Sequence, residues 1–224
     1  MDKNSISKTL EQLRKDEVKR KFSQSVDLII NLKDLDLKKP ENQVDLFVSL
    51  PHFRGKKIKT CAIVGGELLA NAKENCDLII SNDQFPKYAG NKKEIKKLAE
   101  GYDFFIAQAN IMPDIAKIFG SVLGPRKKMP NPKAGCVVPP TANLKLLVEK
   151  LQKTIRLQAK TEYSMKCSVG VETMTDEQLS DNLMLVYNSI LGALPSEKDN
   201  IKNMMLKLTM GKPIKLSEET EKNK

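Results

Sequence analysis

The chain has 224 residues and a formal net charge of +10, from 38 Lys and Arg against 28 Asp and Glu. This balance favours a polyanionic partner, a nucleic acid or an anionic membrane, although a solvated lysine surface gives the same count. No apolar run reaches the roughly 18 residues of a spanning helix, and the polar first residues are not a secretory signal, so we expect no membrane partner. The only histidine is His52, and the cysteines are isolated at 61, 76, 136 and 167. We therefore expect no metal site, no cofactor and no histidine-dependent triad.

The first region combines a helix with two strands. Ile6, Leu10 and Leu13 have helical spacing, and the predicted helix ends in the basic run 19–21. Residues 26–32 and 44–50 alternate apolar and polar side chains, which is typical of half-buried strands. Because a polar loop joins them, we predict that these two strands form an antiparallel pair.

The middle region changes rhythm. Short apolar strands alternate with helices along it, which favours a small parallel α/β domain. The predicted strands are 59–64, 76–80 and 104–108, and the predicted helices are 67–74, 92–100, 112–119 and 144–153.

The last region returns to the first pattern. Residues 154–171 are β-compatible and partly alternating. Thr175, with Gln178 three residues later, forms a capping box that opens a helix with one apolar stripe. A final strand alternates from Met204 to Met210, and the charged residues 217–224 are predicted to be disordered.

These regions predict a discontinuous α+β domain, an antiparallel sheet with helices, into which a Rossmann-like three-layer α/β domain is inserted. The first domain would comprise residues 1–66 and 156–224, and the inserted domain residues 67–155. Two chain crossings between the domains would permit hinge motion.

Gly65 and Gly66 follow a strand and precede a helix, a position where a phosphate can bind to helix N–H groups. The dinucleotide and P-loop fingerprints are both missing, so a plain tight turn is the better interpretation. A nucleotide-using enzyme remains the alternative from another functional class. We expect no enzyme, because the sequence shows no convincing acid–base constellation.

The segment 124–135 is rich in proline and carries four cations with no acid. Proline excludes a helix interior, so the loop is stiff. It either presents its cations to phosphates or is a surface loop with solvated charges. Its cations are Arg126, Lys127, Lys128 and Lys133.

Two other segments carry hydrogen-bonding groups beside cations or glycine. In the first, Lys21 precedes Phe22, Gln24 and Ser25, which suit contacts to RNA, although cations also stabilise a helix C-terminus. The second is 209–213, where Gly211 either lets the backbone approach a ligand or only permits a sharp turn.

The chain closely resembles the large-subunit ribosomal protein L-one family, the protein of the mobile stalk beside the ribosomal E site. The resemblance covers essentially the whole chain and is carried by Leu123–Gly135, Lys21–Val26 and Leu208–Gly211. Residues 174–178 and 32–36 look archaeal rather than bacterial. At position 127 the family often has glycine, where this chain has lysine.

The resemblance implies a cytoplasmic component of the large ribosomal subunit that binds stalk ribosomal RNA and helps to release deacylated tRNA from the E site. It also implies repression of translation by binding its own messenger RNA. Away from the ribosome we expect a monomer. The implied RNA-binding residues all lie in the discontinuous domain: Lys21, Phe22, Gln24, Ser25, Lys166, Ser168, Gly170, Thr209, Met210 and Gly211. The cations of the proline-rich loop would be a secondary RNA or tRNA contact.

Overall fold

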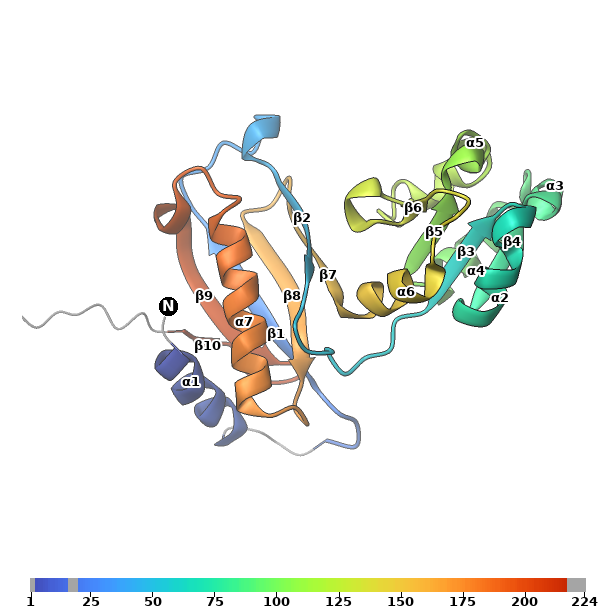
Figure 1. Ribbon diagram of the computed structural model, residues 1–224. Helices are drawn as coiled ribbons and strands as arrows, with labels where there is room; N and C mark the ends of the chain where they lie inside the picture. The colour runs from blue at the N-terminus through green and yellow to red at the C-terminus, as the bar shows by residue number, and fades with distance from the viewer. Residues whose placement is uncertain (1–2, 16–19, 217–224) are drawn as a thin grey trace, which may run out of the picture. The chain divides into compact units, whose positions relative to one another are not determined.

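The computed structural model describes residues 3–15 and 20–216, and it divides into two compact units (Figure 1). Unit 1 consists of Met1–Lys56 and Lys153–Lys224, and unit 2 of Lys57–Gln152. The tail 217–224, predicted to be disordered, lies outside the described residues. No helix in the described part of the chain is long and apolar enough to cross a membrane.

Unit 1 contains a four-stranded antiparallel sheet, a separate strand pair and two long helices. The sheet has the order β10-β9-β1-β8, and β2 pairs with β7. Its elements are α1 (Lys3–Lys15), β1 (Ser25–Leu32), a 3-10 turn (Pro40–Asn42), β2 (Val44–Ser49), β7 (Thr154–Ala159), β8 (Ser164–Val171), α7 (Asp176–Leu191), a 3-10 turn (Glu197–Asn200), β9 (Ile201–Leu208) and β10 (Ile214–Lys215).

The alternation of β1 decides which face of this sheet is covered. Val26, Leu28 and Ile30 are buried, and they share a hydrophobic core with α1 and α7. The predicted stripe on α7 is part of this core, and Thr175 caps the helix by accepting a hydrogen bond from the Gln178 amide at 3.4 Å. The residues between the buried positions of β1 are only partly covered, so one face of the sheet stays open to solvent.

The predicted pairing of the first two strands is wrong. β1 lies between β8 and β9, whereas β2 pairs with β7 in register from Val44↔Ala159 to Ser49↔Thr154. Alternation shows which face of a strand is buried but does not identify its partner, and the best matching partners come from the distant end of the chain. The predicted β stretch 154–171 is interrupted at residues 160–163, which separate β7 from β8.

Unit 2 is built on a parallel four-stranded sheet of order β4-β3-β5-β6. Each of its first three strands is followed by a 3-10 turn and a helix. The elements are β3 (Thr60–Val64), η2 (Gly66–Leu68), α2 (Leu69–Asn75), β4 (Leu78–Ser81), η3 (Asn82–Gln84), α3 (Phe85–Tyr88), α4 (Lys92–Gly101), β5 (Phe104–Gln108), η4 (Ala109–Ile111), α5 (Met112–Leu123), η5 (Pro132–Ala134), β6 (Val137–Val138) and α6 (Leu144–Lys153).

Strand β3 is buried at all five positions, which requires cover on both faces of the sheet. Cys61 and Ile63 belong to one core cluster with residues of α4 and α5. Ala62 and Val64 point to the other face by alternation, and they are equally buried. The short apolar strands that the sequence indicated are therefore the centre of a mixed α/β unit.

Unit 2 begins ten residues earlier than the predicted inserted domain, at residue 57 against 67, and ends three residues earlier, at 152 against 155. Residues 57–66 belong to unit 2, because β3 pairs there with β4 and β5. The chain enters and leaves unit 2 at neighbouring points. Leu50 N donates to Lys153 O at 2.9 Å, and Gln152 exchanges two hydrogen bonds with the Ile58 backbone at 2.8 and 2.7 Å. Unit 2 is thus inserted between the paired strands β2 and β7, at the position where a hairpin would have its turn.

Candidate nucleic-acid interface

The start of β1 and the end of β9 are joined by a compact set of hydrogen bonds. Ser25 N donates to Thr209 Oγ1 at 2.9 Å, Thr209 N donates to Ser25 O at 3.1 Å, and the two hydroxyls lie 3.0 Å apart. These bonds fix a turn in which Gly211 N donates to Leu208 O at 2.9 Å. The predicted segments around 22–25 and 209–211, which are far apart in sequence, therefore meet at one end of the sheet.

Two large apolar side chains stand exposed at this end. Phe22 is 50% exposed and Met210 is 62% exposed. The backbone of Met210 is held by Gln24, whose Oε1 accepts the Met210 amide at 3.1 Å. We call the set Phe22, Ser25, Thr209, Met210 and Gly211 the end patch. A fixed apolar surface beside hydroxyls and accessible backbone suits stacking and hydrogen bonding to unpaired bases.

The open face of the sheet continues from the end patch into a shallow hollow of about 380 Å³. Ser25 Oγ donates to Asp27 Oδ1 at 2.9 Å, which links the two surfaces. Lys207 of β9 lies opposite Asp27 and Lys166 of β8 opposite Ile29, and neither lysine has a salt-bridge partner among the described residues. The lining residues are Asp27, Ile29, Lys166, Cys167, Ser168 and Lys207.

Sequence reasoning missed Asp27, Ile29 and Lys207 in this hollow. Alternation along β1 and β9 shows that these side chains point away from the core, but not that the two strands are neighbours. Cys167 also lines the hollow and packs against the core of unit 1, and burial raises the pKa of its thiol to about 12. It is therefore a neutral packing group and no nucleophile near neutral pH.

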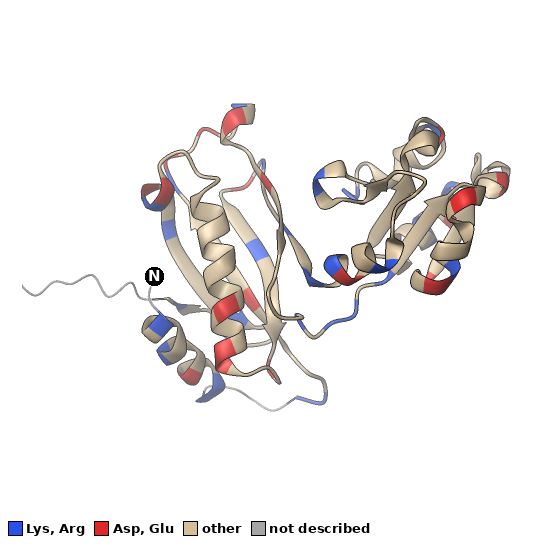
Figure 2. Ribbon diagram, in the orientation of Figure 1, with Lys and Arg blue, Asp and Glu red and all other residues tan. Residues whose placement is uncertain are grey.

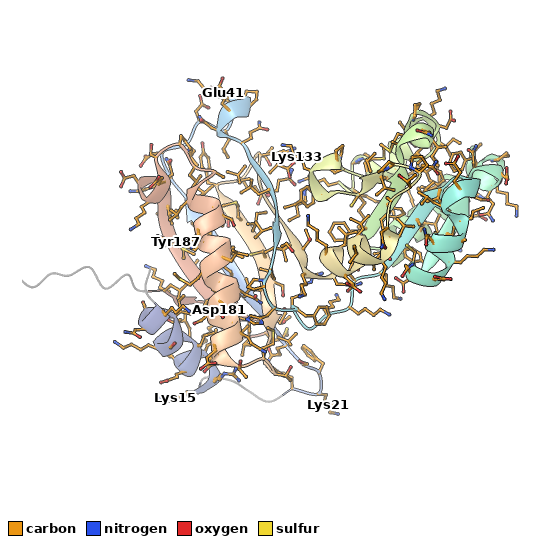
Figure 3. The ribbon with its side chains drawn as sticks, viewed as in Figure 1. Lys15, Lys21, Glu41, Lys133, Asp181 and Tyr187 are labelled. Carbon is orange, nitrogen blue, oxygen red and sulfur yellow. The ribbon has the colours of Figure 1, made fainter. Side chains whose placement is uncertain are left out.

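Two predicted contact residues face inward. Gln24 is 2% exposed, so its side chain positions the Met210 backbone instead of reaching a ligand. Gly170 is buried, and a Cβ there would lie 2.5 Å from Leu179 Cδ2 and 2.7 Å from Met174 Sδ. This glycine lets β8 approach α7. Lys21 is exposed in the loop before β1, where its side chain extends outward (Figure 3).

The proline-rich loop of unit 2 directs two of its cations to the protein. Lys128 Nζ donates to Ala99 O and Tyr102 O, both at 2.8 Å, at the C-terminus of α4. There a cation satisfies carbonyls that lack helical partners and matches the negative end of the helix dipole. Arg126 forms a salt bridge with Glu100 at 3.1 Å. The idea that Lys128 is a solvated surface charge is wrong, whereas Lys133 is exposed.

Comparisons with known proteins identify the family of this chain. A family model described as the ribosomal protein L1p/L10e family matches residues 13–212. The chain belongs to the ribosomal protein L1p/L10e family. A protein named large ribosomal subunit protein uL1 from Pyrococcus abyssi is 41% identical over 96% of both chains. Proteins of the same name are 43% identical in Methanothermobacter thermautotrophicus, over 88% of this chain and 91% of theirs, and 38% identical in Methanocaldococcus jannaschii, over the full length of both.

Lys127 occupies a position that the resemblance assigns to glycine in many members of the L1p/L10e family. Its φ is 58°, in the left-handed region that side chains with a Cβ disfavour. Lys127 N donates to Gly124 O at 2.9 Å, so the strained residue closes a turn at the end of α5. The loop keeps a backbone conformation suited to glycine even though lysine is present.

The Gly65–Gly66 segment is built as a turn in this family member. Gly65 N donates to Gln108 Oε1 at 2.8 Å, and the Gln108 amide lies 3.4 Å from Glu67 Oε2. A carboxylate beside the turn disfavours a phosphate there.

His52 has an acidic neighbour, Asp181, at 3.4 Å, but Lys3 binds the same carboxylate. Members of the L1p/L10e family are structural ribosomal proteins and not enzymes.

Proposed function

We propose that this chain is a structural constituent of the large ribosomal subunit that binds the ribosomal RNA of the mobile stalk through the end patch and the open face. The observation that carries the proposal is the hydrogen-bonded junction of Ser25 and Thr209, at the end of the sheet where Met210 and Phe22 are both exposed. Membership in the L1p/L10e family supports the ribosomal setting. This role places the protein in the cytoplasm.

The two surfaces suit different parts of an RNA. Phe22 and Met210 offer apolar contacts to exposed bases, and the hydroxyl of Thr209 suits a 2′-hydroxyl or a base edge. Lys166 and Lys207 flank the hollow as cations for phosphates, and Asp27 between them accepts hydrogen bonds from amino groups of bases. We therefore propose that the phosphate contacts supply much of the affinity and that the end patch supplies the sequence preference.

The finer parts of the function follow from the same surface. In this proposal the bound stalk RNA carries the protein beside the E site, where it assists release of deacylated tRNA. A free monomer would use the end patch to bind its own messenger RNA and repress translation, in competition with ribosomal RNA. Unit 2, as a Rossmann-like three-layer scaffold, would contribute secondary contacts. Among the loop cations proposed for that role, Lys133 is exposed, and its ammonium binds no carbonyl or carboxylate among the described residues.

The proposal is tested by filter binding of the full chain to a stalk fragment of large-subunit ribosomal RNA. Thr209→Val removes a hydroxyl at nearly constant volume, and we expect at least tenfold weaker binding, about 1.4 kcal/mol. Met210→Asp places a negative charge on the patch and should weaken binding further. The control, Lys198→Ala, changes an exposed residue elsewhere in unit 1 and should leave the affinity within twofold.

A second measurement identifies the RNA without assuming its sequence. RNA that copurifies with the protein is sequenced, and the stalk region of the large-subunit ribosomal RNA should be enriched. Reads spread in proportion to total cellular RNA, together with unchanged binding by the Thr209 and Met210 variants, would refute the proposed function.

A further inference from the structure

Helix α4 of unit 2 carries an exposed arc of three lysines. Ile95 and Ala99 are buried against the unit, and the opposite side of the helix faces solvent. At 100° per residue, Lys93, Lys96 and Lys97 fall together on that side, and all three are exposed. Lys92, the first residue of the helix, is also exposed but lies closer to the direction of Ala99. Figure 2 shows the lysines and arginines of unit 2 in blue.

The acids of the same helix do not neutralise this arc. Glu100 shares the exposed side, but Arg126 pairs with it at 3.1 Å. Glu94 lies toward the flank of the helix beside α3, where its charge contributes to raising the pKa of Tyr88 after the larger effect of burial. Within the described residues, neither the three lysines of the arc nor Lys92 has a carboxylate at salt-bridge distance. The loop arginine thus leaves the arc with its full positive charge.

This arrangement works against the stability of the helix. Lys92 and Lys96 are like charges four residues apart, as are Lys93 and Lys97, and each such pair costs about 0.2–0.5 kcal/mol. Lys92 and Lys93 also lie in the first turn, where the helix dipole disfavours cations. The contacts that hold α4, its buried side, the Asn91 cap and the Lys128 bonds at its C-terminus, do not involve these lysines. A bound polyanion would turn the same charges into favourable contacts.

We propose that the lysine arc of α4 is a second RNA-binding surface that contacts the phosphate backbone without reading sequence. The inference rests on the proposed role in RNA binding and adds a surface separate from the end patch. Lysine is a point charge that suits phosphates, and α4 has no aromatic side chain for stacking on bases. The arc is distinct from the cations of the proline-rich loop, two of which bind protein groups.

The test uses the full chain and a labelled 20-base-pair RNA duplex of arbitrary sequence. In the variant, Lys93, Lys96 and Lys97 are replaced by glutamine, which keeps helix propensity while removing charge. Loss of three phosphate contacts should flatten the slope of log affinity against log salt by about 2–3, at about 0.9 per contact. At low salt we expect at least tenfold weaker duplex binding. In lysine acetylation footprinting of the unaltered chain, the duplex should protect these three side chains.

A matched control makes the same change in net charge elsewhere. Glutamine at Lys38, Lys39 and Lys198, all exposed in unit 1, should leave the duplex slope nearly unchanged. Equal losses in both variants would overturn the proposal, because total charge alone would then explain the binding. Unchanged duplex binding by the α4 variant would also overturn it. So would a variant that loses binding to phosphatidylserine vesicles but still binds the duplex normally.

The stalk fragment separates this inference from the proposed function. If the α4 variant binds the duplex normally while Thr209→Val weakens stalk binding, only the lysine arc is refuted. If Thr209→Val has no effect on stalk binding while the α4 variant loses the duplex, the end patch is refuted and the lysine arc stands.

Discussion

The end patch of unit 1 and the proline-rich loop of unit 2 both look like RNA contacts in the sequence, yet their polar groups are used differently. In the end patch, Ser25 and Thr209 bond to each other and hold apolar side chains outward. In the loop, Lys128 and Arg126 bind groups of the protein itself. A cation in a conspicuous motif can therefore be a structural group, and its partners decide between the two roles.

Replacing Lys128 should have the largest effect on stability. Lys128→Met removes two hydrogen bonds from a charged donor to the end of α4, and we expect unit 2 to lose about 2–3 kcal/mol. Urea unfolding followed by circular dichroism measures this loss. Lys133→Ala is the control, with an expected loss below about 0.5 kcal/mol. Stalk RNA binding by folded Lys128→Met should stay within twofold, and a loss like that of Thr209→Val would make the loop a primary RNA contact.

Gly170 tests the corresponding claim in unit 1, that a residue near the interface serves packing. Gly170→Ala places a Cβ against Leu179 and Met174, so we expect a loss of about 1–2 kcal/mol from overpacking. Gly120→Ala is the matched control, because a Cβ there meets no atom within 4 Å and alanine favours the helix. Denaturant unfolding should show opposite signs for the two variants. Normal stability with impaired RNA binding in Gly170→Ala would restore this glycine to the contact surface.

Lys127 gives the smallest expected effect, and it is a gain. Lys127→Gly relieves a left-handed conformation that costs about 1–2 kcal/mol for other residues, against a flexibility cost of about 0.5–1 kcal/mol. Unit 2 should gain about 0.5 kcal/mol in thermal or urea unfolding. Lys133→Gly, within the short turn η5, should instead lose stability. A loss in Lys127→Gly would mean that interactions of the lysine side chain outweigh the backbone strain.

The sequence predicted most elements, because alternation and helical spacing report burial directly. Residue type and the family resemblance singled out the two segments of the end patch, whose role in RNA binding stays a prediction. It did not predict that β1 pairs with β8 and β9, since partner choice depends on contacts between distant residues. Without that pairing, Asp27 and Lys207 could not be placed in one hollow. The burial of Gln24 and Gly170 was hidden for a related reason: residue type fits both a ligand contact and an internal role.

The hairpin geometry also predicts that the two units can be separated experimentally. Ser49 pairs with Thr154, and the adjoining Leu50–Lys153 hydrogen bond closes the β2–β7 pair before the chain enters unit 2. Arg156 reinforces the pair by binding both carboxylate oxygens of Asp45, at 2.9 and 3.0 Å. The core of unit 1 is formed within its own two segments. A short linker should therefore be able to replace unit 2.

The most direct test of the end patch as the main RNA-binding site is deletion of unit 2. Residues 57–152 are replaced by a short Gly/Ser linker, folding is checked by circular dichroism, and binding to the stalk fragment is measured by filter binding at fixed salt. We predict a folded protein that binds the stalk RNA within about tenfold of the full chain, or 1.4 kcal/mol, and that Thr209→Val weakens this binding as it does in the full chain. A folded deletion protein that has lost specific stalk binding would contradict the account and place the main site in unit 2.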